Sequence, residues 1–558
     1  MADVQDFIDE FHQLEKDRGT TEDTWQEIAD YVVPHRTGFD TYEPKKGEKR
    51  GKDIYDGTPL GALNMYASGS MGYLLSASYR WFGLRVPDER LMDVREIRLW
   101  LANVDTVLDS MINRSNFYKE MFEFFRDGGS FGTATMYRYW DTAQNRECFS
   151  VRHPRECFFA ENEHGEVDTV FRYTLLSAKN IVKRFKDGTV DEEITKDAQD
   201  PQQKHRDYKL LHVVVPNEKY DPEKRDSKSK KYSSYYIDIN HESLIRERGY
   251  DVMPYAVWRV EKQSDEIYGR GPGWSALSDI KALYQYAKTD IETAQRMVNP
   301  PLDIPAERRG QIKFVPGGRN YYEEAGRKVE VLQPTVDLRP GLDREDRKQK
   351  IIERHFMVDF FMMMAQAERE MTATEIRRRQ EEKAVLLGPH ITGLNQDVLD
   401  KIIDGLFADA WEAGMIPDPP RLLVESMQGQ KLEVDYMGPL AQAQRSFFHA
   451  EPYRKTLNDI AVIIQMDPTG STTKVLDNYD WDRVAREMAK ANGLPEESLI
   501  DERIRDKIRQ ARAEQQAKQQ QLAAMEQLGK AVPGLNEPVE EGSVLAGMGQ
   551  QAAGQTAP

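Results

Sequence analysis

Cysteine is scarce in this chain: Cys148 and Cys157 are the two cysteines among 558 residues. A fold held together by several disulfides is therefore excluded, and folding in the cytosol is favoured. No apolar run approaches the roughly 20 residues that a helix needs to cross a bilayer. The N-terminus, MADVQDFIDEFHQLEKDRG, carries acidic residues where a signal peptide has a positive start and an apolar run. We expect an intracellular product with no membrane partner.

Basic residues are outnumbered by acidic ones. The 77 Lys and Arg residues against 94 Asp and Glu residues leave a formal net charge of −17. A protein that grips nucleic acid over its whole surface favours a basic balance, so the acidic balance of this chain argues against that class. The net charge does not exclude local basic patches, or a surface along which DNA slides without binding tightly. The length is sufficient for several domains of about 100–200 residues each.

Sequence signatures of nucleotide chemistry are also missing. There is no GxxxxGK[ST] phosphate loop, so an ATP motor of that kind is not expected. The stretch YGRGPGWS, Tyr268–Ser275, has glycines before a predicted helix, but not in GxGxxG spacing. A tight turn into the helix is the better interpretation, and nucleotide binding is the weaker one. Acidic residues are too numerous for any pair to be singled out as a general acid and base.

Two cysteines and two histidines lie close together in the sequence. Cys148, His153, Cys157 and His164 follow the spacing C-x4-H-x3-C-x6-H, which is not a known zinc-ligand pattern. Alternate residues of a strand also point to opposite faces. Buried thiols and surface histidines are the favoured interpretation. We therefore expect no metal, no cofactor and no catalytic residue, and the chain is predicted not to be an enzyme.

Hydrophobic periodicity divides the first half of the chain into a helical part and a β-rich part. Residues 4–140 are predicted to be mostly helical; in TTEDTWQEIADYVVPHR, Thr21 is placed to cap a helix that stops at Pro34. From about Thr133 to Glu261 the pattern changes to short β-branched and aromatic runs, interrupted by a helix near Ala178–Phe185. The small residues of GALNMYASGSMGYLLSAS favour a helix that packs closely against its neighbours.

Two long helices that flank a small β-like insert are predicted next. Apolar residues at helical spacing predict a helix over Ser275–Val298, about 36 Å long. After Asn299-Pro300-Pro301, the segment IKFVPGGRNYYEEAGRKVEVLQP is predicted to be compact and β-like. A second long helix is predicted to begin near Asp343 and to run through IIERHFMVDFFMMM. Its methionine run, Met362–Met364, is predicted to pack in a core or an interface.

The stretch MTATEIRRR predicts a new helix start. Thr372 and Glu375 form a capping box, and an apolar face then continues for about nine turns, with a kink at Pro389. Beyond it, PRLLVESMQGQKLEVDYMGPL predicts a β-hairpin with its turn at Gln428-Gly429. The segment PEESLIDERIRDKIRQARAEQQAKQQQLAAMEQL predicts a helix with a thin apolar seam. The tail from residue 532 is predicted to be disordered.

A resemblance to a known family runs along residues 20–500. It is carried, in this order, by YDGTPLGALNMYASGSMGYLLSASYRWFGL, FFRDGGSFGTATMY, EIYGRGPGWSAL, MVNPPL, MTATEIRRR, VDYMGPLAQAQR and DRVAREMAKANGLP. Together with the succession of helices, β-rich region, long helix, insert and long helix, these stretches resemble the portal proteins of tailed bacteriophages. The most similar group is the head-to-tail connector family of short-tailed, T7-like phages.

The resemblance implies an α+β portal-type fold that is mainly helical, with a β-rich wing, long stem helices, a small α/β clip and a C-terminal helical crown or barrel. Twelve copies would form a ring at one vertex of the capsid. Genomic DNA would be packaged through the channel of this ring by the terminase and later ejected into the tail. The ring would also be a platform for head assembly and tail attachment. The protein would be assembled in the host cytoplasm and would reside in the virion.

The resemblance also implies a division of the chain. It assigns 1–267 to the wing, 268–299 to the first stem helix, 300–340 to the clip, 341–361 to the second stem helix, 362–371 to the tunnel loop, 372–490 to the long kinked helix and the remainder of wing and crown, 491–531 to the crown or barrel helix, and 532–558 to a disordered tail.

Three groups of site residues follow from this resemblance. Those of the tunnel loop, which would face the DNA channel, are Met362, Met363, Met364, Gln366, Glu368, Arg369, Glu370 and Met371. Those of the second stem helix, which would make weak contacts with DNA, are Lys348, Lys350 and Arg354; a solvated or inter-subunit salt-bridge role stays open for them. Those of the clip, which would bind the terminase and then the tail adaptor, are Arg308, Arg309, Lys313, Arg319, Tyr321, Tyr322, Arg327 and Lys328.

The implied partners are further copies of the chain, double-stranded DNA, the terminase large subunit, tail adaptor and nozzle proteins, the major capsid and scaffolding proteins, and internal core or ejection proteins. Two other classes are weighed against this. A nuclease or ATPase acting on phage DNA lacks its motifs. A tail adaptor would be much shorter and lack the two long helices, and a scaffolding protein would be nearly all helix.

Overall fold

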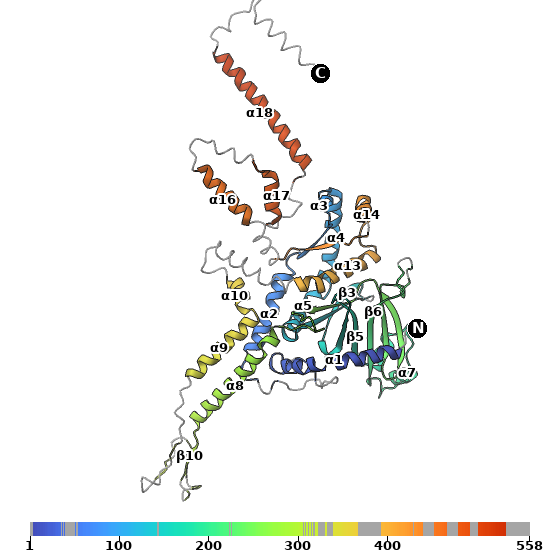
Figure 1. The fold of residues 1–558 in the computed structure, drawn as a ribbon, viewed down its shortest axis with the longest axis vertical. Coiled ribbons are helices and arrows are strands. Elements are labelled where there is room, and N and C mark those ends of the chain that lie inside the picture. Colours follow the sequence, from blue (N-terminus) through green and yellow to red (C-terminus); the bar gives the residue numbers. More distant parts are fainter. Residues whose placement is uncertain are drawn as a thin grey trace, which may run out of the picture. The chain divides into compact units, whose positions relative to one another are not determined.

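The chain divides into two compact units in the computed structural model, Met1–Glu451 and Pro452–Pro558 (Figure 1). The structure describes residues 4–34, 36, 38–39, 51, 54–141, 144–221, 224, 226–304, 306, 309–310, 312–313, 315, 319–321, 330–331, 339–366, 392–427, 429–438, 451–465, 478–491, 500 and 502–531. Helices and antiparallel strands both occur, which confirms the mixed helix and sheet class. The capping box at Thr372 and Glu375 and the kink at Pro389 lie outside the described residues, as do most of 41–53 and the tail.

The N-terminal helices surround one large apolar core, as the periodicity predicts. They are α1 (Val4–Tyr31), α2 (Thr58–Leu74), α3 (Glu89–Met92), α4 (Arg95–Arg114) and α5 (Phe117–Phe131). Large side chains, among them Trp25, Trp81, Phe117 and Phe124, are fully buried where these helices meet. The small-residue helix is α2, and its close packing against α5 and α10 (Val358–Gln366) confirms the expectation for that segment.

The predicted cap at Thr21 is wrong, because α1 continues through it. Arg18 gives the physical reason. Its buried guanidinium donates hydrogen bonds from Nη1 to the carbonyl oxygens of Pro154 and Cys157, at 2.9 and 2.7 Å, and stacks over the ring of Phe158. These tertiary contacts hold the helix where local sequence favours a break. The helix ends at Tyr31, before Pro34, as predicted.

Two antiparallel sheets form the β-rich region, and both match the predicted span. In one, the strand order is β3-β2-β9; in the other it is β4-β5-β6-β7-β8. Their bounds are Thr133–Asp141 (β2), Arg146–Arg152 (β3), Cys157–Glu161 (β4), Val167–Ser177 (β5), Asp207–Pro216 (β6), Tyr232–Asp238 (β7), Ser243–Tyr250 (β8) and Tyr255–Arg259 (β9). A short 3-10 turn, η1 (Pro154–Glu156), joins β3 to β4. The helix expected near residue 178 is α6 (Ala178–Arg184); the pattern misses α7 (Glu192–Gln199).

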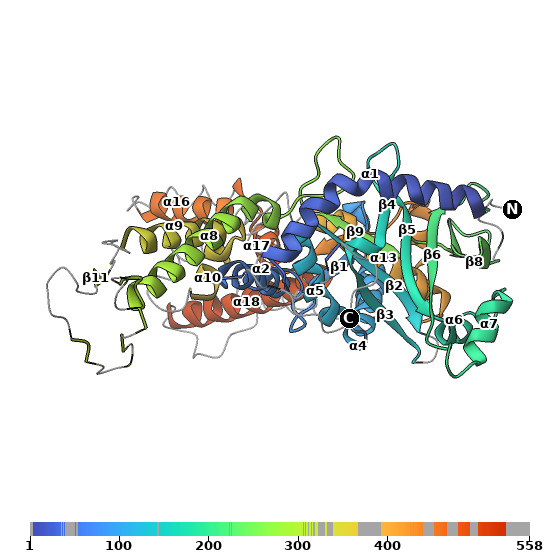
Figure 2. The ribbon, with the colours of Figure 1, turned by 90° about the horizontal axis from the view of Figure 1, so that it is seen from below.

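The five-stranded sheet is covered by helices on both faces. α1 lies along one face (Figure 2), where Ile8 and Phe11 pack against Phe158 and other apolar side chains of the strands. On the other face, Ile181 of α6 and Ile194 of α7 pack with residues of β6, β7 and β8. Side chains alternate along each strand, so both faces of the sheet are supplied with apolar residues.

The predicted helix, insert and second helix follow the sheets. α8 (Pro272–Val298) confirms the first helix, and β10 (Leu302–Asp303) pairs antiparallel with β11 (Glu330–Val331) in the insert. The second helix is not continuous. It consists of α9 (Arg339–His355) and α10 (Val358–Gln366), separated at Phe356 and Met357. The single helix predicted over 341–361 is therefore wrong in this respect.

The predicted β-hairpin after residue 420 is wrong. Arg421–Met427 forms a helix, α14, and β12 (Glu433–Tyr436) pairs instead with β1 (Phe82–Arg85), about 350 residues earlier in the chain. Before these elements, a π-helical segment, η4 (Asn395–Leu399), leads into α13 (Asp400–Glu412). The strand finds a distant partner, and hydrophobic alternation alone does not identify which partner that is.

The second unit contains most of α16 (Glu451–Gln465), together with α17 (Trp481–Ala491) and α18 (Glu502–Ala531). Asp482 of α17 pairs with Arg505 and Arg509 of α18. The apolar seam of α18 is thin: Ile504 and Ile508 are both exposed in the single chain. The prediction of a long helix in this segment is confirmed.

Candidate functional site

The α8–α9 helix hairpin carries the first group of candidate residues. Its inner face is built from Leu277, Ile280 and Leu283 of α8 and from Ile352 of α9, all buried. The two helices run side by side and lead to the β10–β11 pair (Figure 1). Burial of one apolar face leaves the opposite face of α9 in solvent. The basic residues predicted to contact DNA can therefore be sorted by whether they lie on this exposed face.

Lys348 is engaged within the hairpin. Its Nζ lies 2.5 Å from Oδ1 of Asp279 on α8, and the hydrogen bond to this carboxylate raises the pKa of Lys348. His355 lies 3.7 Å from the same carboxylate. The ion pair joins the two helices of one chain, so Lys348 is not a free cation in the described structure.

Lys350 and Arg354 are exposed, and sequence reasoning missed a third basic residue on their face. Arg347 is exposed as well, and the spacing of 347, 350 and 354 places the three on one side of α9. None of them forms an ion pair or hydrogen bond with another described residue. Asp343 and Asp346 precede them on the same helix and are also exposed. We call Arg347, Lys350 and Arg354 the basic stripe.

The described part of the predicted tunnel loop is helical. Met362, Met363, Met364 and Gln366 all belong to α10, so a loop beginning at 362 is wrong for these positions. Met362 is exposed, at 37%. The helix persists because Phe360 and Phe361, just before the methionines, are buried against the core. The remaining predicted residues of this group, Glu368, Arg369, Glu370 and Met371, lie outside the described residues.

The predicted clip group is partly described. Arg309, Lys313, Arg319 and Tyr321 are exposed, and Tyr321 has 79% of its surface in solvent. The backbone of Lys313 is tied to Asn320, whose side-chain amide bonds both its N–H and its carbonyl oxygen, at 2.8 and 3.1 Å. Arg308, Tyr322, Arg327 and Lys328 lie outside the described residues. The described members offer basic and aromatic groups on one short insert.

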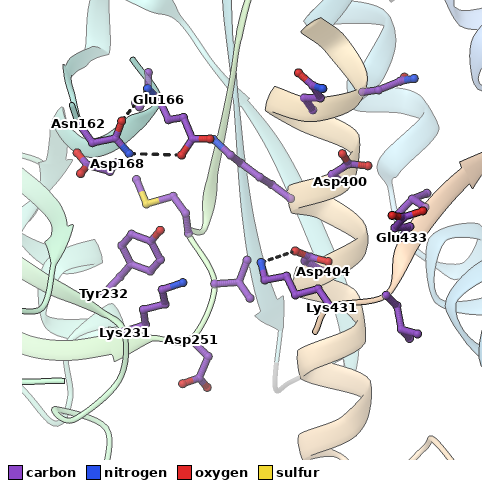
Figure 3. Close-up of a pocket in the computed structure, with 18 of the residues that line it drawn as sticks. Asn162, Glu166, Asp168, Lys231, Tyr232, Asp251, Asp400, Asp404, Lys431 and Glu433 are labelled. Carbon is purple, nitrogen blue, oxygen red and sulfur yellow. Dashed lines mark hydrogen bonds and ion pairs between the residues drawn. The ribbon is translucent and has the colours of Figure 1, made fainter. Parts of the chain in front are cut away.

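A polar cleft of about 670 Å³ was not predicted (Figure 3). Carboxylates gather around it from the sheet, from α13 and from β12, and lysines lie among them. The charged lining residues are Glu166, Asp168, Lys231, Asp251, Asp400, Lys401, Asp404, Lys431 and Glu433. They come from segments far apart in the sequence, so no local motif marks them.

One ion pair and one hydrogen bond engage carboxylates of the cleft. Nζ of Lys431 lies 3.1 Å from Asp404, and the Tyr436 hydroxyl donates to Oδ1 of Asp400 at 2.5 Å. Burial raises the pKa of Asp400 and lowers that of Lys401. Within the described part of the chain, no three Asp, Glu, His or Cys side chains come together as a metal would require. The cleft is a polar junction between the sheet and α13.

The residues weighed for zinc do not form a site. Cys148 and Cys157 are buried free thiols, and burial raises the pKa of Cys157 to about 12. His153 accepts a hydrogen bond at Nδ1 from the backbone N–H of Arg155, which starts a 3-10 turn. His164 is exposed. The thiols are core side chains, as predicted. The predicted surface position is wrong for His153, which is buried with its ring against those of Phe39 and Phe131.

The glycines of YGRGPGWS bring the start of α8 against the end of α5. A β-carbon at Gly269 would lie 2.6 Å from the carbonyl oxygen of Gly132, and one at Gly271 would lie 2.5 Å from that of Gly128. Backbone therefore packs on backbone at this point, and the absence of side chains is a packing requirement. The stretch leads directly into α8, as predicted, but Gly271 is extended and Arg270 forms an isolated β-bridge with Glu261, so the predicted tight turn is wrong.

The described helices include none that is both long enough and apolar enough to cross a bilayer.

Comparison with known proteins identifies the same family as the sequence motifs. A model of a family described as bacteriophage head to tail connecting protein matches residues 4–500. The chain is 30% identical to a probable portal protein of Bordetella phage BPP-1, over 92% of each chain. It is 27% identical to a portal protein of Salmonella phage epsilon15, over 94% of each chain. The chain therefore belongs to the bacteriophage head to tail connecting protein family.

Proposed function

We propose that this chain is the portal protein of a tailed bacteriophage. Copies of it form a ring at one vertex of the capsid, DNA enters the head through the channel of the ring, and DNA later leaves through it into the tail. The observation that carries the proposal is the match of a head to tail connecting family over residues 4–500. Both relatives compared are named as portal proteins or probable portal proteins.

The proposed roles of the elements follow the chain. The ring has twelve copies; α8 and α9 form its stem, and the insert at 300–340 forms the clip. The N-terminal helices and both sheets form the wing, to which the β1–β12 pair also belongs. α18 contributes to a crown or barrel. The family match ends at residue 500, before α18, so the proposal for this helix rests on its own exposed seam.

In the channel, the basic stripe makes weak contacts with DNA phosphates. Affinity grows with each phosphate that a protein neutralises, so a surface that must release DNA continuously needs few cations. The stripe offers three free basic groups per copy, whereas Lys348 is held by Asp279. The net charge of −17 per chain disfavours tight binding elsewhere. Met362 and the residues that follow it, through Met371, face the channel beyond the stem.

The exposed basic and aromatic groups of the clip bind the terminase large subunit during packaging and the tail adaptor afterwards. The wing contacts the major capsid and scaffolding proteins, and internal ejection proteins meet the crown. The chain has no catalysis of its own in this proposal, since the terminase supplies the ATPase. The protein is assembled in the host cytoplasm and is retained in the virion.

The mass and symmetry of the purified protein test this proposal. Native mass spectrometry should give a closed assembly of about a dozen copies, and negative-stain class averages should show a central hole. A chain that is monomeric alone should close into such a ring when co-expressed with its capsid and scaffolding proteins. A stable dimer with nuclease or ATPase activity, under both conditions, would overturn the proposal.

A further inference from the structure

Glycine permits direct contact between α2 and α10 at one point. Gly69 is buried, and a β-carbon at this position would lie 2.8 Å from Cε1 of Phe361 and closer still to Cδ1 and Cγ. Side chains in folded proteins do not approach so closely, so the ring occupies the space that any other residue at 69 would need. Gly72, three residues further along α2, has open space in the same position.

The Phe361 ring is enclosed on its other sides by aromatic residues. Tyr73 stacks on it with centroids 6.2 Å apart and planes 14° apart, and Tyr66 meets it edge-on at 6.2 Å. Phe360 lies against it at 5.2 Å. Phe361 is 5% exposed. Because close-packed neighbours surround the ring, it has no free volume into which to turn away from an added methyl group.

The axis of α10 does not continue the axis of α9. The chain turns at Met357, whose φ of +56° lies in the left-handed region that non-glycine residues rarely adopt. The backbone N–H groups of Phe360 and Phe361 both donate to the carbonyl oxygen of Met357, at 3.0 and 3.2 Å. α10 therefore begins anew after the turn, and its contacts with α2 hold its axis.

We propose that Gly69 is a positioning residue: by seating Phe361, it sets the direction in which α10 presents Met362 to the channel. This inference rests on the proposed function, because the channel role of Met362 is itself part of that proposal. α2 is held in turn by α5, where a β-carbon on Gly129 would lie 2.8 Å from Cδ1 of Tyr66. The helical core of the wing thus contributes to the orientation of the channel segment, in addition to the contacts of α10 with α9.

A spin label on α10 tests the seating. Cys148 and Cys157 are buried, so a Met362→Cys substitution supplies the accessible thiol for labelling the purified full-length protein. Adding Gly69→Ala should increase the mobility of the label, whereas Gly72→Ala, the matched control on the same helix, should leave it unchanged. Replacing Phe361 by Leu in the Gly69→Ala background should restore order, because the smaller side chain makes room for the methyl group. Equal label mobility in the Gly69→Ala and Gly72→Ala proteins would overturn the inference.

A packaging assay, with Met362 retained and with procapsids and terminase of the same phage, tests the link to function. Gly69→Ala should lose packaged DNA while native mass spectrometry shows the wild-type assembly, and Phe361→Leu should rescue packaging. Full packaging despite a mobile label would refute the positioning role and leave the portal proposal intact. Absence of packaging by the wild-type protein, with the label responding as expected, would instead count against the proposed function.

Discussion

At the scale of single residues, buried polar side chains join elements that are distant in sequence. Arg138 of β2 donates to Glu147 of β3 at 3.0 Å and also pairs with Asp409 of α13. Burial raises the pKa of Glu147 to about 7, against the opposing effect of Arg138. Removing one member of such a buried pair leaves an uncompensated charge, which costs about 3–5 kcal/mol. Side chains of this kind define the fold without marking a catalytic site.

His212 makes stability depend on pH. It is fully buried, with Nδ1 2.6 Å from the Tyr255 hydroxyl and Nε2 2.9 Å from that of Ser234. Burial and four nearby arginines, Arg152, Arg172, Arg184 and Arg246, lower its pKa well below the usual value. The folded state therefore favours neutral histidine. Its contribution to stability is complete above about pH 6.5, the unfolded pKa, and is lost as the pH falls below that value.

We expect the unfolding midpoint of the wild-type protein to fall more steeply between pH 7 and pH 5 than that of His212→Gln. A single proton contributes at most about 1.4 kcal/mol per pH unit. His241 is the matched control, because its hydrogen bond to Asp238 raises its pKa. Its contribution is present at low pH and is lost as the pH rises, so His241→Gln should change the slope in the opposite direction. Identical pH slopes for the wild type and His212→Gln would contradict the assignment.

At the scale of elements, the α8–α9 hairpin has basic residues of two kinds: Lys348 forms an ion pair between the helices, and the basic stripe is exposed to solvent. Lys348 and Asp279 link the two helices, while the basic stripe has no partner among the described side chains. The face that a helix buries is set by its apolar residues, but the role of each charge on its border depends on the neighbouring helix. Substitutions in the basic stripe should consequently change DNA binding, whereas substitution of Lys348 should change the free energy of unfolding.

Charge reversal of the stripe, Lys350→Glu with Arg354→Glu, should weaken binding of duplex DNA to purified rings and reduce its dependence on salt, because fewer phosphates are neutralised. The unfolding midpoint should stay near that of the wild type. Lys348→Gln is the control. It should lower the free energy of unfolding by about 0.2–1 kcal/mol, as expected for a partly exposed ion pair near the protein surface, and leave the salt dependence unchanged. The reverse pattern would show that Lys348, not the stripe, contacts DNA.

At the scale of the whole molecule, the family match does not end at the boundary between the two units. The matched region includes all of the first unit from residue 4 and extends into the second unit as far as residue 500. α18 follows, with Ile504 and Ile508 exposed at 47% and 39%. Two isoleucines one turn apart offer little apolar area compared with the large core of the first unit.

Removal of residues 501–558 should therefore leave ring assembly intact. Native mass spectrometry of the truncated chain should give the same number of copies as the full-length chain, with a mass reduced in proportion. The control is the double substitution Ile504→Glu with Ile508→Glu in the full-length chain, which should also form rings. Monomers in the truncated preparation would place an essential contact between copies in the removed segment.

Much of this protein follows from its sequence alone. The span of α8, the β-rich region and the family are all read from it, because helical and strand periods are local properties and the family motifs recur in order along the chain. Tertiary structure decided the rest. Tertiary contacts extend α1 through Thr21, the second long helix is interrupted at Met357, and β1 pairs with β12. The polar cleft is also formed by distant segments, and Lys348 forms an ion pair whereas Arg347 forms none with a described residue. Each of these outcomes depends on which distant side chain or strand lies opposite, and a local pattern does not contain that information.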